Sequence, residues 1–155
     1  MQERSPQRYS LTAISAISDT GPIYTLLVQN SSINAQRFND YMMKLLDREK
    51  DRKIVIFLDN APVHKHEELE RMINGIDKKH IVFNAPYTPD CNPIEQFFSE
   101  WKRRVDMKIE QPPDPATLIA IIEEEFMSFT PDYSIDLINN LRKEIVPRVL
   151  NHEIL

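Results

Sequence analysis

The stretch that decides the fold is an apolar run followed at once by polar residues, Ile54-Val55-Ile56-Phe57-Leu58 and then Asp59-Asn60-Ala61-Pro62-Val63-His64. Five consecutive apolar residues predict a short central β-strand that is covered on both faces. Open α/β sheets bind their ligands at the carboxyl ends of such strands, so Asp59 is a candidate site residue. Asp59 could equally form an Asx-turn that leads the chain out of the strand, and position alone favours neither interpretation.

A second informative stretch follows, Pro86-Tyr87-Thr88-Pro89-Asp90-Cys91-Asn92-Pro93-Ile94-Glu95. Asn92 and Pro93 are typical of a helix start and predict a helix that runs to about Val105. Glu95 would be the third residue of this helix, where its side chain can close a capping box onto Asn92. Taken by itself, this structural role is favoured over a functional one. The aromatic and apolar residues that would face the core are Phe97, Phe98, Trp101 and Val105.

Upstream of these stretches, the hydrophobic pattern predicts an antiparallel hairpin and then an amphipathic helix. The hairpin strands are Tyr9 to Ile17 and Ile23 to Val28, with Asp19 as a turn former. The helix starts at Asn34. Its apolar stripe consists of Phe38, Tyr41, Met42, Leu45 and Leu46.

Between the two informative stretches, the pattern predicts a helix from His66 to Ile73 and a strand at Ile81 to Phe83, which gives a parallel crossover with the Ile54 strand. A proline-rich connector at Gln111 to Pro115 then leads to two more helices. We therefore predict an α/β core over residues 1–110 and a helical C-terminal extension over 111–155. The extension helices are expected at Ala116 to Phe129 and Ser134 to Leu150, with N-caps at Asp114 and at Asp132 or Ser134.

Length, charge and cysteine content limit the number of domains, the kinds of partner and the cellular compartment that can be expected. The 155 residues suit a single domain, and the formal charge of −5 is unlike that of an autonomous nucleic-acid binder. The lone cysteine, Cys91, fits a reducing compartment, and we expect an intracellular protein, nuclear or cytoplasmic according to the host. His64 and His66 have no partner at zinc-like spacing. The cluster Lys102-Arg103-Arg104 is a candidate phosphate contact, although such clusters are most often simply solvated.

Read together, the two stretches resemble the DDE transposases of the mariner and related insertion-sequence superfamily. The resemblance rests on Asp-Asn-Ala-Pro-x-His after a strand and on Pro-Tyr-Thr-Pro-Asp-x-Asn-Pro-Ile-Glu before an aromatic-rich helix, and it covers about Ser10 to Val105. The separation of Asp59 from Glu95 is also close to the spacing of that family's second and third acidic residues. Both motifs are long enough to be specific.

The resemblance implies a ribonuclease-H-like mixed sheet flanked by helices and metal-dependent cleavage and transfer of DNA strands. In that family three carboxylates hold two divalent ions, Mg²⁺ or Mn²⁺. Asp59 matches the second carboxylate and Glu95 the third. The other candidate residues are Asn60, His64 and Asn92 for positioning, and Lys102, Arg103 and Arg104 for the phosphates of transposon ends.

Two departures from the family pattern matter. The family's first catalytic Asp lies on a central strand that precedes the hairpin, where this sequence offers only Met1 to Arg8. The helix-turn-helix region that such transposases carry upstream is also missing. We therefore expect a truncated core that is inactive alone. We expect it to form a homodimer or to bind full-length transposase, and we expect no membrane partner. The alternative is a domesticated, non-catalytic dimerisation or binding module.

The first departure also makes a prediction about the sheet. A missing central strand would leave two unpaired edges, which are costly in a buried sheet. If the chain folds alone, the hairpin must pair directly with the Ile54 strand, or a partner must supply a strand.

Overall fold

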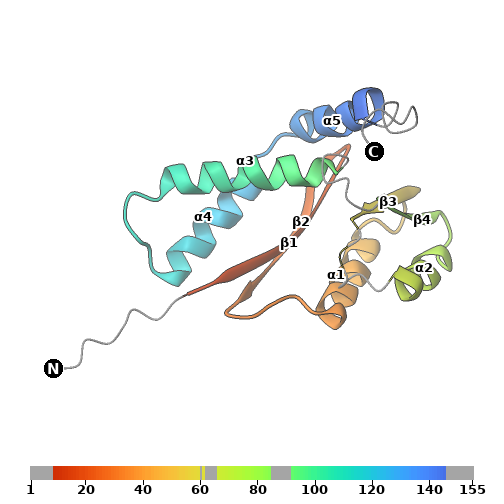
Figure 1. The fold of residues 1–155 in the computed structure, drawn as a ribbon, viewed down its shortest axis with the longest axis horizontal. Helices are drawn as coiled ribbons and strands as arrows, with labels where there is room; N and C mark the ends of the chain where they lie inside the picture. The colour runs from red at the N-terminus through yellow and green to blue at the C-terminus, as the bar shows by residue number, and fades with distance from the viewer. Residues whose placement is uncertain (1–8, 60, 62–65, 85–91, 146–155) are drawn as a thin grey trace.

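The structure is a computed structural model that describes residues 9–59, 61, 66–84 and 92–145. It confirms the predicted α/β class, with small sheets flanked by helices (Figure 1). The elements in chain order are β1 (Leu11–Ser18), β2 (Gly21–Gln29), α1 (Ala35–Arg48), β3 (Ile54–Leu58), α2 (His66–Asn74), β4 (Lys79–Phe83), α3 (Pro93–Lys108), α4 (Pro115–Met127), α5 (Pro131–Asn140) and a π-helical turn (Leu141–Ile145).

The strands form two separate two-stranded sheets within the described residues. β1 and β2 are antiparallel, with an irregularity between Ala16 and Ile17, and β3 and β4 are parallel. The predicted hairpin and the predicted parallel crossover are therefore confirmed. Of the two arrangements expected for a chain that folds alone, direct pairing of the hairpin with the Ile54 strand does not occur, because each strand has only one hydrogen-bonded neighbour in the described part of the chain.

Helix α1 connects the two sheets through a shared core, here called the first core. Asn34 caps the helix by accepting a hydrogen bond from the Arg37 amide, as predicted. All five residues of the predicted apolar stripe are buried, which confirms the helical period. Around them pack residues from both sheets, so α1 holds the sheets together without strand pairing. These sheet residues include Ile14, Tyr24 and Leu26 of the hairpin and Ile54, Ile56, Leu58 and Ile81 of the parallel pair.

The parallel pair is covered on one face only. The side chains of Val55 and Val82 are 62% and 46% exposed, whereas Ile81 is buried in the first core. The prediction that Ile54 to Leu58 would be central and covered on both faces is therefore wrong. An apolar run shows that a strand can be buried, but it cannot show which elements are present to cover it.

A second core lies on the other side of the hairpin, where α3, α4 and α5 pack (Figure 1). Ala13 and Ile17 of β1 contribute to it. The protein's single tryptophan, Trp101, is 5% exposed there, and its indole nitrogen donates a hydrogen bond to the Ile122 carbonyl at 3.0 Å. The buried members of the second core are Phe97, Trp101, Val105, Phe126 and Phe129.

The C-terminal helices differ from the prediction at one cap. Asp114 caps α4 as predicted, accepting hydrogen bonds from the Ala116 and Thr117 amides. Helix α5 begins instead at Pro131 with Thr130 as its N-cap, so the predicted caps Asp132 and Ser134 are wrong. Proline at the first helical position has its φ already set for a helix, which moves the start upstream. The domain boundary near residue 110 stays a prediction. No described helix has the length and apolar character that crossing a membrane requires.

A buried lysine joins the end of α1 to the start of β4. Lys79 is only 1% exposed, and its ammonium group donates hydrogen bonds to the backbone carbonyls of Glu49, Lys50 and Arg52. These carbonyls lie where α1 ends and the chain turns toward β3. Lys79 therefore provides a charged donor to backbone carbonyls of the segment that leads from α1 to β3.

Candidate metal centre

Asp59 lies directly after β3, at the carboxyl end of the parallel pair, as the sequence predicts. Its side chain is half-buried, and its Oδ1 atom accepts a hydrogen bond from the Ala61 amide at 3.1 Å. This is the Asx-turn that the sequence offered as the alternative. An ionised carboxylate has about four lone-pair sites, so this bond is compatible with metal ligation. Asn60 and His64 lie outside the described residues.

Glu95 lies in the first turn of α3, and its side chain is exposed. Asn92 is the N-cap of this helix, and its side chain accepts a hydrogen bond from the Ile94 amide at 3.2 Å. In the described part of the chain, the Glu95 carboxylate makes no hydrogen bond or ion pair, so the capping box is not formed. The Asn92 side chain therefore caps the helix, while the Glu95 carboxylate is available to a ligand.

The two carboxylates come from elements that lie toward the same side of the molecule. In Figure 1 the first turn of α3 is the end of that helix nearer to β3 and β4. Carboxylate oxygens are the ligands that Mg²⁺ and Mn²⁺ prefer, so the chemistry of Asp59 and Glu95 fits such an ion. Among the residues described here, no three or more His, Cys, Asp or Glu side chains gather into a group that could hold a metal. The described part of the candidate centre thus provides two carboxylates.

The predicted basic cluster is largely neutralised by ion pairs on its own helix. Arg103 donates two hydrogen bonds of 2.7 Å to Glu100, and the Arg104 Nε donates to the same carboxylate at 2.9 Å. These hydrogen bonds, first from Arg103 and then from Arg104, lower the pKa of Glu100 to about 2. Lys102 is exposed and has no ion pair with any described residue. The spacing of Glu100 three and four residues before the arginines is the sequence signal for these pairs.

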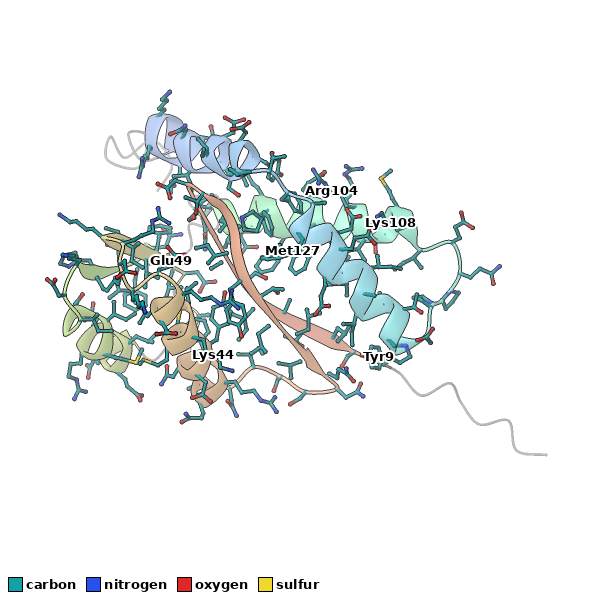
Figure 2. All side chains as sticks on the ribbon, turned by 180° about the vertical axis from the view of Figure 1, so that it is seen from behind. Tyr9, Lys44, Glu49, Arg104, Lys108 and Met127 are labelled. Carbon is teal, nitrogen blue, oxygen red and sulfur yellow. The ribbon has the colours of Figure 1, made fainter. Side chains whose placement is uncertain are left out.

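Arg104 is also packed against the second core. Its guanidinium carbon lies 4.0 Å from the centre of the Phe129 ring, and a terminal nitrogen donates to the Ser128 hydroxyl at 3.3 Å. One turn later, Lys108 pairs with Glu124 at 2.9 Å and with the buried Glu125 at 2.6 Å. These contacts tie α3 to α4 and give both cations a structural role. Figure 2 shows Arg104 and Lys108 along α3 where α4 lies beside it.

Comparison with known protein families matches residues 2–114 to the family described as DDE superfamily endonuclease. The chain belongs to this family. This DDE endonuclease chain contains both predicted motifs within the matched residues, which confirms the resemblance seen in the sequence. No curated protein sequence matches the chain.

Solved structures similar to this DDE endonuclease chain include several of Mos1 transposase. The Mos1 catalytic domain with Raltegravir and Mg has a TM-score of 0.73 and 19% identity, covering 86% of this chain and 70% of that one. The Mos1 mariner paired end complex with Mn has a TM-score of 0.78 at 18% identity, covering 100% of this chain and 47% of that one. A pre-cleavage Mos1 transpososome gives 0.79 at 14% identity, with 100% and 48% covered.

These matches confirm the predicted ribonuclease-H-like fold class. The chain spans about half the length of the Mos1 chains in the two assemblies. Mos1 structures were solved with Mg and with Mn, so divalent ions accompany this fold in a similar protein.

Proposed function

We propose that this chain is the catalytic core of a DNA transposase, in which Asp59 and Glu95 are two of the carboxylates that bind Mg²⁺ or Mn²⁺. The observation that carries the proposal is the placement of Asp59 at the carboxyl end of β3 together with an uncommitted Glu95 at the start of α3. Membership of the DDE endonuclease family and the Mos1-like fold support it.

The chain's own residues would bind and orient the ions and the DNA. Asp59 and Glu95 supply oxygen ligands, and Asn92 fixes the first turn of α3 from which Glu95 projects. Divalent ions bound there would activate a water or a 3′-hydroxyl and would stabilise the leaving oxygen of a phosphodiester. We also propose that Asn60 and His64 position these ligands, and that Lys102 contacts a phosphate because its charge is not paired.

Among the described residues, this centre has two of the three carboxylates that the family uses. We propose that the third arrives on an extended strand that pairs with the hairpin on one side and with β3 on the other. The separation of the two sheets beneath α1 supports this arrangement, because each sheet keeps an unpaired edge among the described residues. Two carboxylates alone hold two ions poorly, so the chain is expected to be inactive by itself.

Calorimetric titration with Mn²⁺ tests the two proposed ligands. The parent chain should bind Mn²⁺, and Asp59→Ala and Glu95→Ala should each lower its affinity by more than about tenfold, because each removes a charged oxygen ligand.

Matched controls are Asp51→Ala, just before the opposite end of β3, and Asp106→Ala, near the far end of α3. Each removes one exposed carboxylate from the same region and should leave Mn²⁺ affinity close to that of the parent. Equal losses in ligand and control variants would mean that the effect is one of net charge. A parent chain that binds no Mn²⁺ would support the alternative of a non-catalytic remnant.

The open sheet edges also predict self-association. Val55 is exposed on β3 beside an unpaired edge, so light scattering of the isolated chain should show a dimer or larger species. Val55→Lys places a charge on this strand and should shift the population toward monomer. Met127→Lys adds the same charge to a residue that is 75% exposed on α4 and should change nothing. A monodisperse parent monomer contradicts this prediction.

A further inference from the structure

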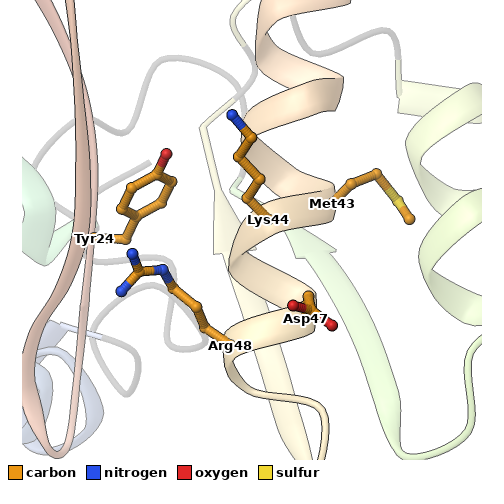
Figure 3. Close-up of a pocket in the computed structure, with 5 residues that line it drawn as sticks. All are labelled: Tyr24, Met43, Lys44, Asp47 and Arg48. Atoms are coloured by element: carbon orange, nitrogen blue, oxygen red, sulfur yellow. The ribbon is translucent and has the colours of Figure 1, made fainter.

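A hollow of about 340 Å³ opens between β2 and α1, away from the candidate metal centre's helix α3. It is lined by Tyr24, Met43, Lys44, Asp47 and Arg48 (Figure 3). The helix residues Lys44 and Arg48 are one turn apart and exposed. In Figure 3 both lie on the side of α1 that faces Tyr24, while Met43 and Asp47 lie on the other side.

Tyr24, which lines the hollow, belongs to an aromatic stack. Tyr24 and Tyr41 are stacked with ring centres 5.0 Å apart and planes 5° from parallel. The Tyr41 hydroxyl donates to the Tyr24 backbone carbonyl at 2.8 Å, and burial raises the pKa of Tyr41, so it stays neutral. The Arg48 guanidinium lies over the Tyr24 ring, 4.5 Å from its centre. This contact holds the guanidinium over the ring without neutralising its charge.

Lys44 and Arg48 differ from three of the cations of α3 in their ion pairing. Arg103, Arg104 and Lys108 are each paired with a glutamate at 2.9 Å or less. Lys44 and Arg48 have no ion pair with a described residue. A phosphate that approached Arg103, Arg104 or Lys108 would have to displace existing ion pairs. A phosphate in the hollow would meet two cations that have no ion pair with a described residue, while the Asp47 carboxylate, which also lines the hollow, lies on the other side of α1.

We propose that this hollow binds the phosphodiester backbone of a nucleic acid, with Arg48, Lys44 and the Tyr24 hydroxyl as hydrogen-bond donors. A planar guanidinium held on a ring matches two phosphate oxygens, and an ammonium adds a point charge. The choice of a nucleic acid rests on the proposed function. The site gives this acidic chain a local cationic contact, and it places DNA on the α1 side of the hairpin as well as near α3.

The test is fluorescence anisotropy of a labelled, mixed-sequence DNA duplex with the whole chain in EDTA, so that metal binding plays no part. Lys44→Ala combined with Arg48→Ala should weaken binding about tenfold and reduce the slope of log affinity against log salt by about one to two, because two phosphate contacts are lost. Tyr24→Phe keeps the ring and should weaken binding less, with an unchanged salt slope.

The matched control is Arg142→Ala combined with Lys143→Ala, which removes one arginine and one lysine from exposed positions after α5. It should leave affinity and slope close to those of the parent, and thermal unfolding should show that all variants are folded. Equal weakening in both double variants would overturn the proposal, and so would an unchanged Lys44/Arg48 double variant.

One further outcome would also overturn it, namely a parent chain that does not bind the duplex. If such a chain binds inorganic phosphate by calorimetry, the hollow is assigned to a free anion, and if it binds neither, the hollow binds no phosphate. In either case the Mn²⁺ titration would still decide the proposed metal centre, because that experiment involves neither Lys44 nor Arg48.

Discussion

Phe97→Ala is expected to lower the free energy of unfolding by about 3–5 kcal/mol, the range for removing a fully buried aromatic ring. Phe97 is 0% exposed at the centre of the second core. Its ring centre lies 4.5 Å from that of Phe129, 5.9 Å from Phe126 and 6.0 Å from Trp101. These partners belong to α3, to α4 and to the segment after α4, so the cavity would weaken several contacts at once.

Urea unfolding measures this loss, with an unchanged dependence on urea showing that the unfolded state is the same. Phe97→Leu keeps much of the volume and should cost less than the alanine variant. Met127→Ala, at a side chain that is 75% exposed, should stay within about 0.5 kcal/mol of the parent. A loss below about 1 kcal/mol for Phe97→Ala would show that the second core is not packed as described.

Lys79→Met is expected to cost about 2–3 kcal/mol, because the carbonyls of Glu49, Lys50 and Arg52 lose a shared charged donor. Methionine replaces the apolar stem of the lysine, so the loss of packing is small and the effect comes from the hydrogen bonds.

The neighbouring Lys78 provides the control. Its side chain is 62% exposed and pairs only loosely with Asp77, at 3.9 Å, so Lys78→Met should change stability by less than about 0.5 kcal/mol. Both variants remove one positive charge from adjacent residues, and urea unfolding compares them directly. Equal stability of the two variants would contradict the role given to Lys79.

Local periodicity and cap chemistry predicted most elements of the fold correctly. The stripe of α1, the Asn92 cap of α3 and the Asp114 cap of α4 all depend on residues within one or two turns of each other. The start of α5 was predicted too late, because Asp132 and Ser134 are preferred capping residues. The helix begins earlier, at Pro131, whose φ is already suited to a first helical position.

The arrangement of the sheets depends on partners that the local sequence does not contain. The run Ile54 to Leu58 predicts a strand. That this strand pairs only with β4 among the described residues, and that Val55 is exposed on it, depends on which other elements lie beside it. For the candidate site, the positions of the residues could be predicted from the sequence, but their hydrogen-bond and ion-pair partners could not. The sequence correctly predicted that Asp59 follows a strand and that Glu95 lies at the start of a helix. Only the structure shows that Glu95 forms no capping box with Asn92 and that Glu100 forms ion pairs with Arg103 and Arg104.

The position of Trp101 gives the protein a built-in optical probe of one half of its interior. Trp101 lies in the second core, on the α3 side of the hairpin, and the first core beneath α1 contains no tryptophan. Its fluorescence emission therefore reports the surroundings of α3, the helix that carries Glu95, whereas far-ultraviolet circular dichroism reports helices on both sides. Coincidence of the two signals during denaturation would show that the two halves unfold as one unit.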